Sequence, residues 1–490
     1  MENKPNSSYF NLIRKEWQFY LTPVIIVLIY VPVIFFSYGF SDDYAFLYNI
    51  NAGIDSQIQS VLSSGRPVLA ALFTFSWGSL TSIHQISCLR FVSILGIGIL
   101  SLIYYWIFRS YHESPITAFF QAILLSLTPA IQLFASWATC SFFPFAMVMA
   151  SLAAYLPRLL RNKTLAYILS MILLEITLLI YQPAAMTYWV VVCIMIFYEY
   201  QFDERINLEK ISKKLITHII VWVIPALLAY LVVRIGSQLF PLFKRSELIE
   251  FKDIPMKLYW FIKEPFSRSL NIFSIQNSSL TTCLVLIFLI TGMFLWLRGK
   301  YDKRVILIFI SFFLILLSYF PNLIVTVYQP SYRSQVALSG IIIVLFLFAL
   351  KGITQWFNPT LLNGILLFMT ITCSLAATKN VIINIAIPQE IELRYLQSQL
   401  NTHPLENVTE IDIIQAESNS LLVPTIIDEF GRPSTNTDWA PEPMIRLILM
   451  EKQPQYLNIP IRVLPPDTES GLTENLSNLV IDMRNISSFK

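Results

Sequence analysis

Charged side chains are scarce in this chain of 490 residues. Asp, Glu, Lys and Arg together make up 13% of it, whereas hydrophobic residues make up 55%. Soluble domains average about 25% charged residues, so this composition excludes an ordinary soluble protein. The formal net charge is only +3, and the basic residues are spread over many loops, which indicates no nucleic-acid partner.

Cysteine is also scarce, and its placement excludes a metal-binding framework. None of the five cysteines has metal-ligand spacing. Each lies in or beside an apolar segment, which is typical of small core residues. The polar segment after residue 378 contains none and therefore needs no disulfides. The cysteines are Cys88, Cys140, Cys193, Cys283 and Cys373.

Long apolar runs, in contrast, recur along the chain. Runs of roughly 20 residues predict membrane helices. The first run is too long for a cleavable signal peptide, and no small-residue cleavage site follows it. The piece at 68–83 is short and interrupted by Gly78, so we expect an interfacial or re-entrant segment there. Eleven spans are predicted, near 20–40, 86–108, 115–135, 141–157, 164–182, 183–200, 216–235, 280–297, 305–327, 335–350 and 360–378.

The distribution of Lys and Arg predicts the orientation of these spans. Basic residues gather in alternate connections, as at Arg158, Arg161 and Lys163. Such segments face the cytoplasm. The N-terminus is therefore expected inside, and an odd number of spans leaves the C-terminal region outside. This places the loops 41–85 and 236–279 on the outer side of the membrane.

The last part of the chain differs in composition from the rest. Residues 379–490 are richer in polar residues and proline. Helix patterns cover 388–400 and 441–452, and strand patterns cover 410–414, 461–464 and 479–482. We therefore expect a transmembrane domain over 1–378 and a small periplasmic α/β domain over 379–490.

Two adjacent carboxylates, Asp42 and Asp43, stand just after the first span. A carboxylate at the water–lipid boundary can act as the general base for an attacking hydroxyl. It can equally cap and solvate the start of an interfacial helix. A third use of the pair is to bind a divalent cation, Mg or Mn. The residues themselves do not distinguish which carboxylate would be the base.

Arg66 and Arg333 fall in the same predicted compartment. Their guanidinium groups match the geometry of a phosphate. A sugar on a polyprenyl phosphate already has a stable leaving group, so its transfer needs a base and positive charge rather than a strong acid. The two arginines are therefore candidate phosphate ligands.

The tripeptide Tyr-Gln-Pro occurs twice, at the ends of two predicted spans. Tyr181-Gln182 and Tyr328-Gln329 each offer hydrogen-bonding side chains that suit a sugar. The alternative is an interfacial aromatic residue beside a helix-ending proline. The second copy leads directly to Arg333, which favours a binding role there.

Four further residues have a candidate role in binding substrate. Glu175 lies inside a span, where an acid must be hydrogen-bonded, hydrated or protonated. Arg268 can reach the same face from the loop at 236–279. In the C-terminal domain, Trp439 can stack on a sugar and Arg432 can bind the acceptor. A structural hydrogen bond or a packed turn is the alternative for each.

The run Gly39-Phe40-Ser41-Asp42-Asp43-Tyr44, with Gly65-Arg66-Pro67 after it, resembles the phage-type O-antigen glucosyltransferases, the Gtr type II serotype-converting group. The resemblance extends to the whole layout and implies a glycosyltransferase C fold. It further implies transfer of glucose from undecaprenyl-phosphate glucose to a lipopolysaccharide O-antigen sugar on the periplasmic side, and we expect an inverting displacement at the anomeric carbon. An acidic residue of the first outer loop would be the base, here Asp42 or Asp43.

Two other functions compete with this one. A lipid-linked sugar flippase would show charges at the bilayer centre and interrupted helices in two related halves. The sequence has one intramembrane acid and no evident repeat, which disfavours it. A non-catalytic membrane subunit that presents its C-terminal domain to an envelope partner is the other alternative.

Overall fold

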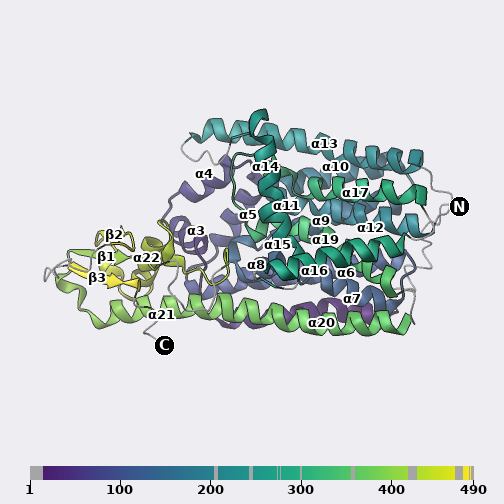
Figure 1. Cartoon of the computed structure of the whole chain (residues 1–490). Coiled ribbons are helices and arrows are strands. Elements are labelled where there is room, and N and C mark those ends of the chain that lie inside the picture. The colour runs from purple at the N-terminus through teal and green to yellow at the C-terminus, as the bar shows by residue number, and fades with distance from the viewer. Residues whose placement is uncertain are drawn as a thin grey trace.

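The computed structural model describes residues 15–202, 208–241, 247–272, 274–275, 278–297, 301–354, 359–417, 427–468, 478–484 and 486. Long helices lie side by side in a bundle, and a small α/β unit extends from one end of it (Figure 1). We call residues 379–490 the tail, and we call the end of the bundle that carries it the tail end.

Eight helical segments within the described residues are long and apolar enough to cross a membrane. A helix suits such a segment because its backbone N–H and C=O groups bond to each other, and the core of a bilayer offers them no other partners. The helices of these segments are α2 (Trp17–Tyr30), α6 (Ile86–Ser110), α9 (Phe143–Leu159), α10 (Lys163–Ile180), α13 (Leu208–Leu239), α16 (Ser279–Trp296), α19 (Val336–Thr354) and α20 (Pro359–Val381).

A ninth span is bent. Helices α7 (Pro115–Leu125) and α8 (Pro129–Ser136) meet at an angle of 67°. Thr128 before Pro129 is extended, with φ −62° and ψ 151°, because a residue before proline is disfavoured in the helical region. The break therefore follows from the sequence, and the expected span at 115–135 is two helices rather than one.

The two remaining predicted spans correspond to shorter apolar helices. Helix α12 (Thr187–Phe202) covers the segment expected at 183–200, and α17 (Tyr301–Ser318) covers most of 305–327. Both pack against α19. Of the eleven predicted spans, eight or nine thus have the length and hydropathy of a full crossing.

The first outer segment folds into three short helices at the tail end. These are α3 (Asp42–Asn51), α4 (Ser56–Ser63) and α5 (Pro67–Trp77). The apolar piece expected at 68–83 is mostly α5, which is too short to cross a membrane. The loop after α13 contributes α14 (Ile254–Phe261) and α15 (Ser267–Leu270) at the same end (Figure 1).

The tail has the secondary structure that its sequence predicts. Helix α20 continues through a π-helical turn (Ile382–Ala386) into α21 (Ile387–Thr402), so the boundary expected at 379 lies within one long helix. Strands β1 (Glu410–Ile414), β2 (Ile461–Leu464) and β3 (Asn478–Asp482) form a parallel sheet in the order β2-β1-β3. Helix α22 (Pro441–Lys452) buries Met444, Ile445 and Ile448 in the tail core.

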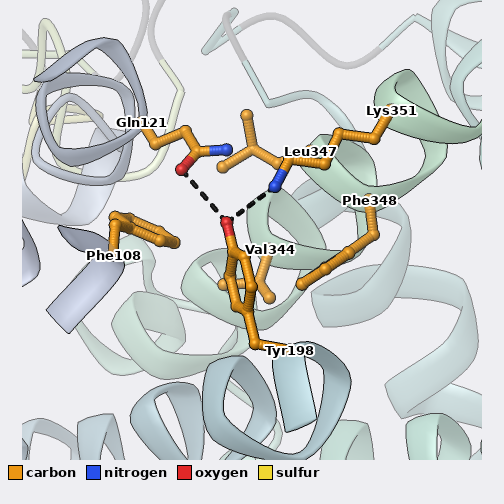
Figure 2. Close-up of a pocket in the computed structure, with 7 residues that line it drawn as sticks. All are labelled: Phe108, Gln121, Tyr198, Val344, Leu347, Phe348 and Lys351. Atoms are coloured by element: carbon orange, nitrogen blue, oxygen red, sulfur yellow. Dashed lines mark hydrogen bonds between the residues drawn. The ribbon is translucent and has the colours of Figure 1, made fainter. Parts of the chain in front are cut away.

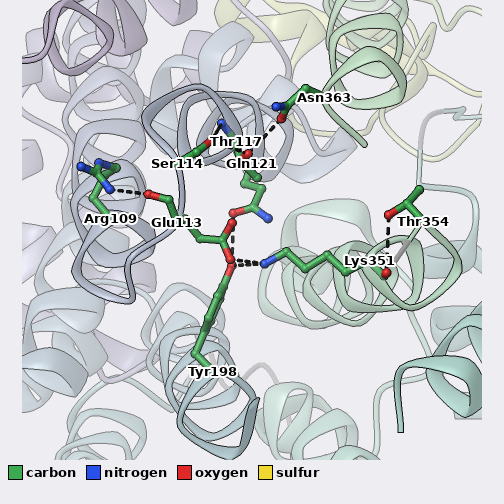
Figure 3. A network of polar contacts seen from close by, with 9 residues as sticks. All are labelled: Arg109, Glu113, Ser114, Thr117, Gln121, Tyr198, Lys351, Thr354 and Asn363. Atoms are coloured by element: carbon green, nitrogen blue, oxygen red, sulfur yellow. Dashed lines mark hydrogen bonds and ion pairs between the residues drawn. The ribbon is translucent and has the colours of Figure 1, made fainter. Parts of the chain in front are cut away.

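A network of buried charges joins the helices at the opposite end. Glu16, before α2, pairs with Arg109 of α6. Lys351 of α19 pairs with Glu113 and donates to the hydroxyl of Tyr198 (Figure 3). The chain therefore enters the bundle at one end and its tail leaves from the other, which is the arrangement that an odd number of crossings requires.

Candidate active site

The two adjacent carboxylates occupy different environments. Asp43 is fully buried, and its carboxylate accepts three backbone N–H groups. These are Phe40 N at 2.9 Å, Thr139 N at 2.9 Å and Ala138 N at 3.3 Å. Asp43 thus joins the start of α3 to the break before α9 and fixes the first outer loop on the bundle.

The electrostatics of Asp43 and its geometry point in opposite directions. Burial raises the pKa of its carboxyl to about 7, although the three N–H groups and the charge of Arg90 lower it. A pKa near 7 suits a general base. However, a base must also reach the attacking hydroxyl, and this carboxylate is enclosed by backbone. The geometry shows Asp43 as a buried acceptor that joins the first outer loop to the break before α9.

Asp42 is partly exposed and faces the tail. Its Oδ1 accepts a hydrogen bond from the indole Nε1 of Trp439, at 2.8 Å. Asp42 also interacts electrostatically with Arg333. Both carboxylates stand in the first turn of α3, where the positive end of the helix dipole favours negative charge. Asp42 therefore combines access, orientation and a nearby cation.

The backbone before Asp42 is strained and is held by the tail. Ser41 has φ 48° and ψ −103°, a left-handed φ that non-glycine residues rarely adopt. Its N–H donates to Ser434 Oγ at 2.8 Å. Ser434 Oγ donates in turn to Gln389 of α21. Asp42 and Asp43 directly follow this strained residue, and its contacts with the tail hold it in place.

Arg333 lies in the turn just before α19, between the helical bundle and the tail. Its Nε is 3.4 Å from Glu429 Oε1, and its guanidinium carbon is 4.6 Å from the centre of the Trp137 ring. The Trp137 ring packs edge-on against Phe40, beside the carboxylate pair. Glu429 thus holds the guanidinium at Nε, and the Trp137 ring covers its face. The contact with Glu429 does not involve the terminal nitrogens.

Arg66 is held in a similar way. Its Nε donates to Gln182 Oε1 at 3.0 Å, and its guanidinium carbon is 5.0 Å from the centre of the Tyr181 ring. Burial raises the pKa of the Tyr181 hydroxyl to about 12, against the lowering effect of the Arg333 and Arg66 charges. Both predicted arginines therefore act on Tyr181, and the structure brings them to one place.

The neighbours of Arg66 explain the Gly-Arg-Pro spacing. Gly65 has φ +71°, and a Cβ at this position would lie 2.2 Å from Cγ2 of Val233 in α13. Only glycine fits such a turn against a neighbouring helix. Pro67 then begins α5, where its fixed φ suits a first helical residue.

The two Tyr-Gln-Pro tripeptides have different surroundings. Tyr181 stacks on Phe143 with a centroid distance of 3.9 Å, and Gln182 bonds to Arg66. Tyr328 instead packs on Trp260, beside Lys257, and Gln329 is exposed. The first copy belongs to the cluster, whereas the second contributes mainly the carbonyl of Pro330, which accepts from Arg268.

The other predicted residues lie farther from the carboxylates. Arg268 pairs with Glu264 and Pro330 O, and it also interacts electrostatically with Asp428. Arg432 bonds to Asn436 within its own loop. The Oε2 atom of Glu175 is buried within α10 and has no hydrogen-bond partner in the described part of the chain. No contact of Glu175 or Arg432 with Asp42 is observed among these residues.

Sequence reasoning assigned no role to two residues that complete the cluster. Glu429 and Asp428 occupy a turn of the tail that packs on Ser331 and Tyr332. Their acidic pair at a Gly-containing turn was visible in the sequence, but its partner, Arg333, is nearly a hundred residues away. The described residues hold no group of three or more His, Cys, Asp or Glu side chains that could bind a metal.

One small pocket lies elsewhere, near the buried charges at the opposite end. Figure 2 shows the Tyr198 hydroxyl between Gln121 and Lys351, with aromatic side chains around it. The space is too small for a water molecule, so it is a packing gap in the bundle rather than a substrate site. Its lining residues are Phe108, Gln121, Tyr198, Val344, Leu347, Phe348 and Lys351.

The fold and the cluster define a polytopic membrane protein with a polar site of carboxylates and arginines at one end of its helical bundle. Residues 29–350 match the family model described as glucosyl transferase GtrII, and the chain belongs to this family. The resemblance inferred from the first outer loop is therefore confirmed, and the protein is a glycosyltransferase by family. A search of curated proteins gives no match. The matched range includes Asp42, Arg66 and Arg333 but ends before the tail.

Proposed function

We propose that this protein transfers glucose from undecaprenyl-phosphate glucose to a sugar hydroxyl of lipopolysaccharide O-antigen, on the periplasmic side of the inner membrane. Family membership supports the glucosyl group. The clustering of Asp42, Arg66 and Arg333 at the end of the bundle that carries the tail supports the lipid-phosphate donor. The basic residues of the opposite connections support the orientation.

The observation that carries the mechanism is the difference between Asp42 and Asp43. Asp43 is enclosed by three backbone N–H groups, whereas Asp42 is accessible and oriented by Trp439. We assign Asp42 as the general base and Asp43 as the residue that positions the loop. The structural alternative considered for the pair was a cap and solvated turn at the start of a helix, but Ser41 is the N-cap residue of α3 and Asp43 is fully buried.

The reaction is a single inverting displacement at the anomeric carbon of glucose. The acceptor oxygen forms the new bond to this carbon as its proton passes to Asp42. The bond between the carbon and the phosphate oxygen breaks, and its electron pair leaves with undecaprenyl phosphate. Arg66 and Arg333 stabilise the departing anion, because preorganised cations act where charge develops.

The acceptor glycan approaches from the aqueous side. Trp439 is 49% exposed, so one part of its ring is available to stack on a sugar while its N–H holds Asp42. Arg432, Gln182 and Tyr181 are further candidates for sugar contacts. A divalent cation is not needed for this scheme, since two guanidinium groups already supply positive charge.

The decisive experiment uses the purified full chain with synthetic undecaprenyl-phosphate glucose and an O-antigen acceptor. We expect a product heavier by one hexose, with the linkage opposite in configuration to the donor. The rival functions predict no product: a flippase would only move the lipid-linked sugar, and a scaffold would need a partner enzyme. Absence of product from folded protein would refute the proposal.

A further inference from the structure

The tail contributes a tight turn to the cluster. Ile427 and Phe430 exchange backbone hydrogen bonds, each at 3.0 Å. Asp428 within the turn has φ +58°, a conformation that Asp and Asn tolerate better than most residues. Gly431 N–H donates to Asn384 O at 2.6 Å, and this fastens the turn to the long helix that carries the tail.

The turn is also fixed from the other side. The ring of Phe430 packs edge-on against Tyr332 at a centroid distance of 5.8 Å. The backbone N–H of Tyr332 donates to Asp428 Oδ2. The turn therefore has a defined position against the start of α19, which is where Arg333 lies.

Glu429 links the turn to Arg333. Its Oε1 accepts the hydroxyl of Ser331 and is 3.4 Å from Arg333 Nε. Its side chain is 8% exposed, and its Oε2 is buried with no donor in contact. A buried carboxylate oxygen without a donor is costly. A proton on a neighbouring acid would give Oε2 of Glu429 the donor that it lacks when both acids are ionised.

Asp428 can supply that proton. Burial raises the pKa of the Asp428 carboxyl well above its ordinary value, and the hydrogen bond and charge of Glu429 raise it further. Two buried carboxyl groups in contact do not both ionise readily. Glu429 is the member of this pair that faces Arg333, so the negative charge of the pair is favoured on Glu429.

We propose that Glu429 is a positioning residue for Arg333 and that the tail thereby builds the donor-phosphate side of the site. Glu429 holds Nε, Trp137 holds the face of the guanidinium, and the terminal nitrogens remain for the phosphate. This inference rests on the proposed role of Arg333 and adds to the tail a function beyond contact with the acceptor.

Two opposing effects follow from a carboxylate beside a phosphate-binding arginine. Its charge weakens the attraction for a second anion, whereas its ion pair with Nε fixes the direction of the guanidinium group. The contact is at Nε, which leaves the edge formed by the two terminal nitrogens for a phosphate, and long side chains lose much freedom when they bind. We therefore expect orientation to dominate, so that removal of the charge weakens donor binding.

The test compares variants of the purified full chain in lipid nanodiscs, with the KM measured separately for undecaprenyl-phosphate glucose and for the acceptor. Glu429→Gln should raise the donor KM about tenfold and leave the acceptor KM within about twofold. Ser331→Ala, which removes only the hydroxyl donor, should raise the donor KM by about threefold.

Glu451→Gln is the matched control. Glu451 also joins the tail to the outer loops, because it accepts from Ile83 N–H at 2.8 Å, but it does not contact Arg333. Its donor KM should not change. If Glu451→Gln raised the donor KM as much as Glu429→Gln, docking of the tail alone would explain the effect and the inference would fail.

The remaining outcomes separate this inference from the proposed function. If Arg333→Ala raises the donor KM but Glu429→Gln and Ser331→Ala do not, the positioning role is wrong and the phosphate role stands. If Arg333→Ala leaves the donor KM unchanged, the phosphate role itself is wrong.

Discussion

The indole Nε1 of Trp439 donates to Oδ1 of Asp42 across 2.8 Å, between residues 397 positions apart in the chain. This bond joins the tail to the first outer loop at the proposed base. One carboxylate oxygen is thereby directed by the indole, and the other is left for the acceptor hydroxyl. The tail is therefore part of the site and not only an appendage of the bundle.

Trp439→Phe tests this bond separately from stacking. Phe keeps an aromatic face for the sugar but has no N–H, so we expect kcat to fall about fivefold to tenfold with little change in the acceptor KM. Trp439→Ala should lower kcat and also raise the acceptor KM, because the ring is lost as well. Steady-state kinetics on both variants check this. Equal effects of Phe and Ala on the acceptor KM would exclude stacking.

Asp42→Asn tests the general base. Asn retains an oxygen that can accept from Trp439 but cannot take the acceptor proton, so we expect kcat to fall by at least about 100-fold. Asp42 is partly exposed, and membrane abundance and thermal stability should stay close to those of the wild type. Glucosylation measured at matched protein levels checks the prediction. An Asp42→Asn variant with wild-type kcat would remove Asp42 from the mechanism.

Asp43→Ala should act mainly on folding. It leaves the N–H groups of Phe40, Ala138 and Thr139 buried without an acceptor, which should cost about 3 kcal/mol or more. The folded pKa of about 7 lies above the ordinary value of 3.8. Between about pH 4 and 7, the wild-type protein therefore takes up a proton at Asp43 when it folds. The stability that this proton contributes is lost as the pH rises through 7.

Thermal unfolding of Asp43→Ala and wild type at two pH values checks both statements. The variant has no carboxyl to titrate at this position, so the stability gap should be larger at pH 5 than at pH 8. A gap that grows with pH would show that Asp43 is stabilised in its ionised form. A variant as stable as the wild type at both values would contradict the role in loop positioning.

Much of the architecture is predictable because the bilayer restricts the chain to apolar helices of known length. The tail is predictable for another reason: its helix and strand periods are local, and the expected 441–452 and 410–414 coincide with α22 and β1. The bend before Pro129 was not anticipated, although a proline that follows two polar residues, Ser126 and Thr128, within an apolar run is a signal for it.

The arrangement of the site is less predictable. Asp42 and Asp43 are neighbours in one helical turn, and the choice between burial and exposure depends on the backbone at 138–139, far along the chain. The repeated Tyr-Gln-Pro tripeptide suggested two equivalent subsites, but only Gln182 contacts an arginine of the cluster. The role of Glu429 depends on a contact with Arg333 that no local pattern encodes.

Glu113 and Lys351 provide a test at the opposite end of the bundle. Their side chains are 12% and 10% exposed, respectively, and pair with each other in the network of Figure 3. Lys351→Met leaves Glu113 as a poorly compensated buried charge, so it should lower the free energy of unfolding by about 3 kcal/mol or more. The double variant Glu113→Gln with Lys351→Met removes both charges and should recover much of this loss.

Because the pair lies far from Asp42 and Arg333, both KM values should remain at wild-type levels in protein that is still folded. Thermal unfolding combined with steady-state kinetics checks this, and a selective rise in the donor KM would mean that the two ends of the bundle are coupled.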